Sequence, residues 1–221
     1  MDQNLLHATY LALAYGALFG AAEWLYHVRK LAAEFTRKVV HSITGLLTLL
    51  FPILLDSHWW VLTLCGSFAA LLLLTQKKGW LPSIHAIDRI SRGSILYPAI
   101  VYGCFWVFEQ SDEVIHFYLP ILIMALCDPL AALVGKRWPL GRYQLFQSPK
   151  TIAGSVAFWA TAFALSWALL QSSTASGVIP HSLLALFLAT VTTLAEGVSG
   201  RGYDNFTIPT VALLVLWLFG Y

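Results

Sequence analysis

Long apolar runs follow one another along almost the whole chain, and this feature restricts the possible folds most strongly. The runs are roughly 15–25 residues long, enough for a helix to cross a hydrocarbon core of about 30 Å. Of the 221 residues, 58% are hydrophobic and only 11% are charged. A soluble domain of this size has too little interior to bury so much apolar surface. The sequence therefore predicts an all-α membrane protein, built from helices that satisfy their own backbone polar groups in lipid.

The boundaries of these runs predict eight transmembrane helices. The connections between them are short, so we expect one integral-membrane domain over residues 1–221. The spans are placed at about 4–27, 39–55, 58–75, 94–109, 114–134, 152–170, 180–198 and 207–221.

The positions of the basic residues agree with this count. If successive loops alternate in side, all 13 Lys and Arg fall on one side, within residues 28–38, 76–93, 135–151 and 199–206. The opposite loops carry acids but no Lys or Arg. By the positive-inside rule the basic side is cytoplasmic, which leaves both termini outside. We expect a multi-pass protein of a bacterial cytoplasmic membrane.

Four polar motifs lie at the cytoplasmic ends of the predicted spans, and the first is "EFTRKVVHSITG" (34–45). Arg37, His41 and Gly45 are spaced i, i+4, i+8, so they share one helix face. A cation, an imidazole and a glycine on one stripe, with Lys38 beside them, could hold an anionic head group. The alternative is a snorkelling cation and a His that bonds a neighbouring helix.

The second motif is "CDPLAALVGK" (127–136), in which Asp128 lies inside an apolar run. An ionised carboxylate in hydrocarbon costs at least a few kcal/mol. Ala131, Ala132 and Gly135 give the same face small side chains, and Lys136 follows directly. An acid beside a basic, glycine-containing loop suits a metal–phosphate complex. The alternative is an Asp that pairs with a loop cation for structural reasons.

The third motif is "SPKTIAGS" (148–155), where Lys150 and Thr151 immediately precede the sixth span. The first-turn amides of a helix are unpaired and its dipole is positive there, which predicts an anion site. The alternative is that the Lys-Thr pair merely caps the helix.

The fourth motif, "TTLAEGVSGRGYDNFTIP" (192–209), adds Glu196, Arg201 and Asp204 around a glycine-rich turn. These carboxylates could complete a metal and nucleotide site on the same membrane side as Asp128. For Asp204 and Asn205 the alternative is an N-cap of the eighth span.

The order of these motifs resembles the dolichol kinase and phytol kinase family over about residues 34–210. That family includes CTP-dependent diacylglycerol kinases and is related to phosphatidate cytidylyltransferases. The chain departs from the family pattern at Cys127, where Gly is usual, and at Ala153, where Glu is common. The matching segments are "RKVVH" (37–41), "GSILYP" (93–98), "CDPLAALVGK" (127–136), "KTIAGS" (150–155) and "EGVSGRGYDN" (196–205).

The resemblance implies a kinase that moves the terminal phosphate of CTP, with Mg²⁺, to a membrane isoprenoid alcohol at the cytoplasmic face. The acceptor would be phytol, geranylgeraniol, farnesol or a polyprenol such as dolichol. The catalytic residues would be Asp128, His41 and Asp204, and the metal ligands Asp128, Asp204 and Glu196. The nucleotide would contact Lys136, Lys150, Thr151, Arg201, Gly135, Gly154, Ser155 and Asn205, and the acceptor Arg37, Lys38, His41 and Gly45.

Three other functions stay open on the sequence. A diacylglycerol kinase or a lipid cytidylyltransferase would use the same motifs with another acceptor or another product. A small transporter would spread its polar residues through the bilayer midplane. Here the polar residues, apart from Glu23, gather at one interface. This distribution favours an enzyme over a transporter. We expect no nucleic-acid partner.

Overall fold

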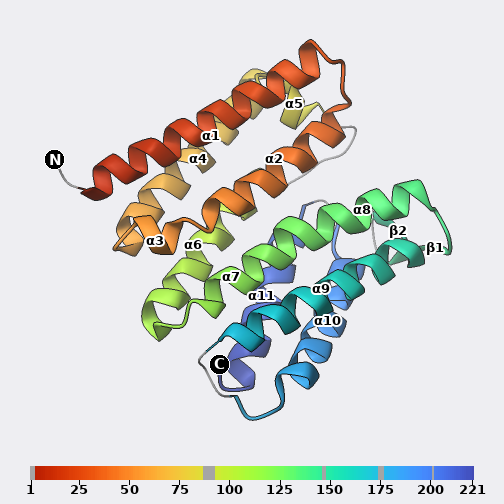
Figure 1. The fold of residues 1–221 in the computed structure, drawn as a ribbon. Helices are drawn as coiled ribbons and strands as arrows, with labels where there is room; N and C mark the ends of the chain where they lie inside the picture. Colours follow the sequence, from red (N-terminus) through yellow and green to blue (C-terminus); the bar gives the residue numbers. More distant parts are fainter. Residues whose placement is uncertain (1–2, 87–92, 146–147, 174–176, 201) are drawn as a thin grey trace.

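Helices make up most of the computed structural model, which describes residues 3–86, 93–145, 148–173, 177–200 and 202–221. Within those residues the prediction of a helical membrane protein is confirmed (Figure 1). The helices are α1 (Gln3–His27), α2 (Ala33–Thr48), α3 (Phe51–Leu54), α4 (His58–Lys78), α5 (Pro82–His85), α6 (Gly93–Ser111), α7 (Ile115–Leu122), the π-helical turn η1 (Ile123–Cys127), α8 (Asp128–Arg137), α9 (Ile152–Ser172), α10 (His181–Val198) and α11 (Asp204–Leu218).

Six helical segments are long and apolar enough to cross a membrane. They are α1, α2 with α3, α4, the continuous run from α7 to α8, α9 and α10. The shorter apolar helix α11 covers most of the predicted eighth span, and α6 covers the predicted fourth without being among the six. Each predicted span thus corresponds to a helix, while the count of eight crossings stays a prediction.

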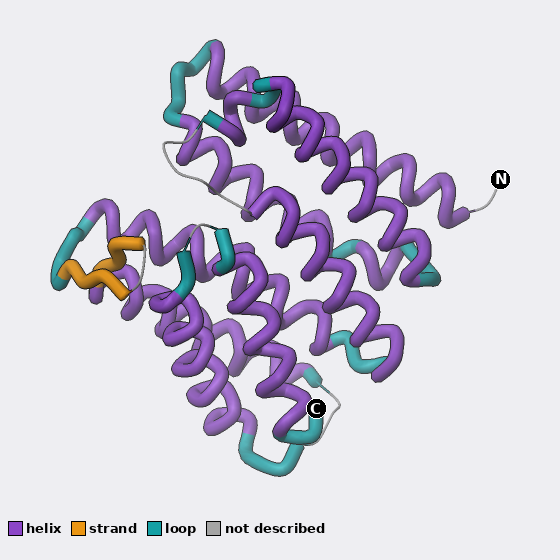
Figure 2. Tube along the Cα trace, turned by 180° about the vertical axis from the view of Figure 1, so that it is seen from behind, coloured by secondary structure: helices purple, strands orange, loops and turns teal. Residues whose placement is uncertain are grey.

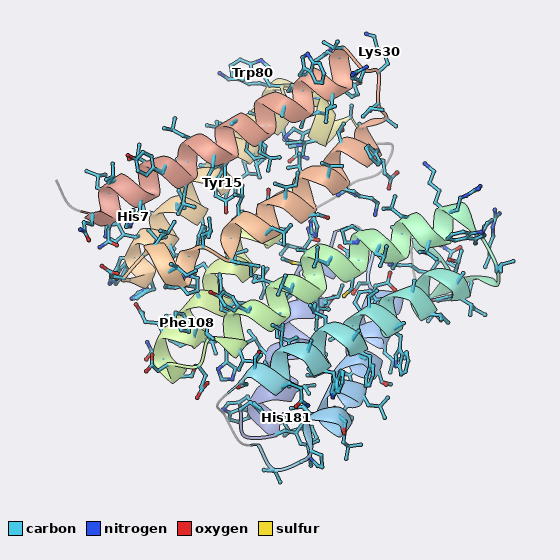
Figure 3. The ribbon with its side chains drawn as sticks, in the orientation of Figure 1. His7, Tyr15, Lys30, Trp80, Phe108 and His181 are labelled. Atoms are coloured by element: carbon cyan, nitrogen blue, oxygen red, sulfur yellow. The ribbon has the colours of Figure 1, made fainter. Side chains whose placement is uncertain are left out.

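The basic ends of the helices gather at one end of the molecule. The turn after α1 and helix α5 lie side by side there, the segment after α8 lies toward the same end, and both chain termini lie toward the other end (Figure 1). In Figure 3, Lys30 and Trp80 mark the first end, while His7, Phe108 and His181 lie away from it. The last turns of α4 and α8 bring further Lys and Arg to the basic end. This agrees with the predicted alternation of loops, and the membrane side that this end faces stays a prediction.

Short sequence signals set the helix ends. The Ser57 side chain accepts a hydrogen bond from the Trp59 amide and so starts α4. Gly79, with φ of 67°, ends the same helix in the left-handed conformation that glycine adopts at little cost. Pro52 lies at the start of α3, where its missing amide hydrogen is tolerated, and the chain turns between α2 and α3.

The helices form two groups, seen from behind in Figure 2. Each group has its own buried core. Phe51, Val61 and Phe105 lie in the first core, which joins α1 to α4 with α6 and one face of α7. Phe158 and Leu188 lie in the second, which joins α9, α10 and α11 with the other face of α7, η1 and α8. The continuous helix from α7 to α8 is therefore shared by both groups.

A β-hairpin that the sequence analysis did not anticipate connects α8 to α9. Strand β1 (Arg142–Leu145) pairs antiparallel with β2 (Ser148–Thr151), with Arg142 opposite Thr151. The hairpin fixes the position of Lys150 and Thr151 at the start of α9.

Candidate active site

A cavity of about 430 Å³ lies at the basic end, where α2 of the first group meets α8 to α11 of the second. All four sequence motifs contribute to its wall, although they are far apart in the chain. The predicted site residues that line it are Arg37, Lys38, His41, Asp128, Gly135, Lys136, Lys150, Thr151, Gly154, Ser155, Glu196, Asp204 and Asn205.

Two carboxylates face this cavity from the first residues of two helices. Asp128 begins α8 and Asp204 begins α11, and the two interact electrostatically. Oδ1 of Asp204 also accepts a hydrogen bond of 3.0 Å from the Asn205 amide. Two like charges in a partly buried site are unfavourable unless a cation lies near them. The pair therefore predicts a bound cation or a close basic side chain.

The acids fit a magnesium–phosphate complex better than a metal held by protein alone. Among the described residues, no group of three or more His, Cys, Asp and Glu is placed to hold a metal. Mg²⁺ commonly uses one or two carboxylates and takes its other ligands from water and substrate phosphates. Asp128 and Asp204 match that pattern.

Glu196 has a different neighbour from the one that the sequence suggested. Its carboxylate forms an ion pair and hydrogen bond with the Lys150 ammonium, and both side chains are largely buried. Burial acts to lower the pKa of Lys150, but the carboxylates of Glu196, Asp128 and Asp204 outweigh it and raise that pKa above its ordinary value. Lys150 is therefore a permanent cation in the cavity at neutral pH.

The start of α9 corrects the expectation of free first-turn amides. The Ile152 amide donates to the Gly141 carbonyl at 3.0 Å, and the Gly154 amide donates to Oγ1 of Thr151 at 3.0 Å. The Ala153 amide donates weakly to the Leu140 carbonyl at 3.5 Å. Because the segment before β1 and the Thr151 cap use these donors, the basic side chains of the cavity wall are the remaining source of positive charge for an anion.

Two glycines let α8 and α9 approach closely beside the cavity. A Cβ on Gly135 would lie 2.5 Å from Oγ1 of Thr151, and one on Gly154 would lie 2.8 Å from the Ala131 carbonyl oxygen. Real side chains do not fit at such distances, so both positions need glycine. The small-residue face predicted around Asp128 therefore packs against α9 and positions Thr151.

His41 is fixed by a contact that the sequence did not reveal. Its Nε2 lies 3.1 Å from the carbonyl oxygen of Met124, in the π-helical turn η1. Pro129, five residues after Met124, has no amide hydrogen to donate to that turn. The hydroxyl of Tyr97 donates to the His41 carbonyl at 3.3 Å, and the two rings pack edge to face.

Two predicted residues are not placed in the cavity wall. Gly45 packs against Ala125 and the Tyr97 hydroxyl, where it allows α2 to approach η1, and it does not line the cavity. Arg201 lies outside the described residues. The free Met124 carbonyl agrees with the expectation that Pro129 releases backbone groups beside Asp128, but its contact with His41 was not foreseen.

The fold and the cavity together define a polytopic helical membrane protein with a phosphate-compatible site at its basic end. A phytol kinase from Synechocystis sp. is 33% identical over 226 residues, covering 98% of this chain and 91% of that protein. The chain belongs to the phytol and dolichol kinase family and is thus a membrane kinase that phosphorylates an alcohol. No family model and no solved structure matches the chain.

Proposed function

We propose that this protein transfers the terminal phosphate of CTP to the hydroxyl of a membrane isoprenoid alcohol and releases CDP. The observation that carries the proposal is the convergence of Asp128 and Asp204 with Lys136 and Lys150 in one cavity. Phosphoryl transfer depends on positioning and charge neutralisation, and these residue types supply both.

The two aspartates are the proposed ligands of Mg²⁺. The ion would neutralise charge on the nucleotide phosphates and hold them in position. Glu196 is engaged by Lys150, so we assign it the role of orienting that lysine rather than of binding the metal.

The basic residues of the cavity are the proposed phosphate ligands. Lys150 is largely buried and held by Glu196, whereas Lys136 is exposed at the end of α8. A buried, paired lysine and an exposed one could contact different phosphates of one nucleotide. Arg201 keeps its proposed role as a third cation. The remaining proposed nucleotide contacts lie in the wall and are Gly135, Thr151, Gly154, Ser155 and Asn205.

His41 is the proposed base for the acceptor hydroxyl, with Arg37 and Lys38 beside it. Its Nε2 donates to a carbonyl, so in the neutral ring Nδ1 is the nitrogen that can accept a proton. The acceptor oxygen attacks the terminal phosphorus, the bond from that phosphorus to the bridging oxygen breaks, and CDP leaves. The hydroxyl proton passes to Nδ1 of His41.

The choice of CTP and of an isoprenoid acceptor is supported by family membership. The similar Synechocystis protein is a phytol kinase, and the motif order resembles that of the CTP-dependent family. We place the site on the cytoplasmic face of a bacterial membrane, because the cavity lies at the basic end.

Purified protein in detergent tests this proposal. It is incubated with Mg²⁺, CTP labelled at the terminal phosphate, and phytol, geranylgeraniol, farnesol or diacylglycerol. The expected result is a labelled isoprenoid monophosphate together with CDP. Pyrophosphate with a CDP-linked lipid would show a cytidylyltransferase, and labelled phosphatidate alone would show a diacylglycerol kinase.

A further inference from the structure

A second, smaller cavity of about 110 Å³ lies within the first helix group, between α1, α2, α4 and α6. Arg37, His41 and Asn205 line both this cavity and the larger one. The two spaces therefore meet at His41, the proposed base. We call the smaller space the apolar cavity.

Carbon covers most of the wall of the apolar cavity. Phe19, Leu64, Phe68, Leu72 and Val101 face it from three helices, whereas the larger cavity is lined by acids and lysines. A pocket with an apolar wall and few polar groups is suited to an apolar ligand.

The polar groups in this wall are mostly satisfied within the protein. The Tyr15 and Thr48 hydroxyls are hydrogen-bonded to each other at 3.0 Å, and Thr48 also donates to the Thr44 carbonyl at 2.7 Å. The Thr44 hydroxyl differs, because its oxygen is buried and has no hydrogen-bond partner among the described residues. Thr44 lies one turn after His41 on α2, so this unpaired hydroxyl is close to the junction of the cavities.

We propose that the apolar cavity holds the part of the acceptor's hydrocarbon chain next to its hydroxyl, and that this hydroxyl lies at the junction beside His41 and Thr44. This inference rests on the proposed function and adds the location of the lipid. The acceptor would enter the reaction from the first helix group and the nucleotide from the second. The phosphate would cross between them at His41.

The far end of the apolar cavity is formed by aromatic rings. Tyr15, which points from α1 toward α2, bonds Thr48, two turns beyond His41 and so about 10 Å away along the helix (Figure 3). Its ring packs edge to face against Phe68 at 4.7 Å and against Phe51 at 6.5 Å between centroids. These rings would limit how far a chain can run straight before it must turn.

Two substitutions in the wall test the location, each with a control on the same helix. Phe68→Ala enlarges the far end and is compared with Leu71→Ala, because Leu71 is exposed on α4. Val40→Phe fills the cavity and is compared with Ile43→Phe, because Ile43 is exposed on α2. The acceptors are geraniol, farnesol and geranylgeraniol, and the measured quantities are kcat/KM for each alcohol and KM for CTP.

Phe68→Ala should raise the preference for geranylgeraniol over geraniol about tenfold, since one methylene in an apolar pocket changes selectivity by about 10-fold or more. Val40→Phe should lower kcat/KM for all three alcohols about tenfold or more and leave KM for CTP unchanged. If both variants behave like their controls, the hydrocarbon chain of the acceptor does not lie in the apolar cavity and the inference is wrong.

Crosslinking of the unaltered protein gives a readout that depends neither on turnover nor on folding of a variant. A farnesol analogue with a diazirine on the carbons nearest the hydroxyl is irradiated in the bound state, and the labelled peptides are sequenced. The inference predicts labels on α1, α2 and α4, within the lining of the apolar cavity. Labels confined to α9 and α10 would overturn it. Labels in the apolar cavity with no phosphorylation of any alcohol would uphold the location and refute the proposed function.

Discussion

Nε2 of His41 lies 3.1 Å from the carbonyl oxygen of Met124. This contact joins helix α2 of the first group to the π-helical turn just before Asp128. A carbonyl can only accept a hydrogen bond, so the hydrogen of a neutral imidazole is on Nε2. Nδ1 then carries the lone pair. The contact thus fixes both the position and the tautomer of the ring at the junction of the two cavities. π-Helical turns are frequent at functional sites, and here the turn presents the carbonyl that holds His41.

Replacing His41 by Gln separates its hydrogen bond to Met124 from its proposed role as a base. The Gln amide can still donate to the Met124 carbonyl, but it has no basic nitrogen to accept the hydroxyl proton. We expect His41→Gln to lower kcat by about 10²-fold at neutral pH, with KM for CTP nearly unchanged. Initial rates at saturating alcohol measure this. A variant that keeps more than half of the wild-type kcat would show that His41 is structural.

The Lys150–Glu196 pair predicts a separation of stability from nucleotide binding. Glu196→Gln leaves a largely buried ammonium without its carboxylate and should lower stability by up to about 3 kcal/mol. The double variant Lys150→Met with Glu196→Leu removes both charges and should recover stability but not activity. Thermal unfolding in detergent and KM for CTP are measured for each.

Lys136→Met is the matched control for this pair. Lys136 is exposed in the same cavity, so its loss should raise KM for CTP and leave the unfolding temperature unchanged. If Lys136→Met and Glu196→Gln lowered stability equally, the ion pair would not be the element that positions Lys150.

Much of the fold follows from the sequence because the membrane restricts it. Long apolar runs must be helices in lipid, and the asymmetry of Lys and Arg orders them. The hairpin between α8 and α9 could not be foreseen, since Arg142–Leu145 and Ser148–Thr151 are short and pair only with each other. The sequence predicted one continuous span at 39–55, whereas the chain turns between α2 and α3 just before Pro52.

The topology can be tested directly with reporter fusions. Fusions after residue 145 and at the C-terminus should report opposite sides of the membrane, because all 13 Lys and Arg are assigned to one side. A fusion after residue 112 should agree with the C-terminal one. Signals from the same side at residue 145 and at the C-terminus would exclude the eight-span topology.

The nucleotide preference gives a further test. We expect CTP with Mg²⁺ to support turnover and ATP to work poorly, on the strength of family membership. Ala153 stands where a Glu is common in the family. The variant Ala153→Glu restores that residue and should therefore not weaken the preference for CTP. Equal rates with CTP and ATP would contradict the proposed donor.

Most of the residues proposed for the site from the sequence line one cavity, but several contacts among them were not foreseen. The spacing of Arg37 and His41, and the order of the motifs, indicated which residues face one site. Spacing could not show that Glu196 pairs with Lys150, because helix–helix contacts decide that neighbour. The sequence also suggested free amides at the start of α9, whereas the carbonyls of Leu140 and Gly141, just before β1, accept hydrogen bonds from two of them.

The central claim is that Asp128 and Asp204 hold the metal of one metal–phosphate complex, and carboxamide variants of both residues test it. Asn keeps the shape and hydrogen-bonding capacity of Asp but removes the charge that binds Mg²⁺. We therefore expect Asp128→Asn and Asp204→Asn to insert normally and stay monodisperse. Because they serve one complex, their effects should be less than additive in the double variant. Asp112→Asn, in an exposed turn at the other end of the molecule, is the control and should keep full activity.

The most direct measurement is the rate of lipid-phosphate formation by Asp128→Asn relative to the unaltered protein and Asp112→Asn. The expected result is a loss of about 10²-fold or more, since a charge that acts on the transferred phosphate is missing. A variant that keeps more than about a tenth of the rate, an effect under about 1.4 kcal/mol, would contradict the account and show that Asp128 is structural.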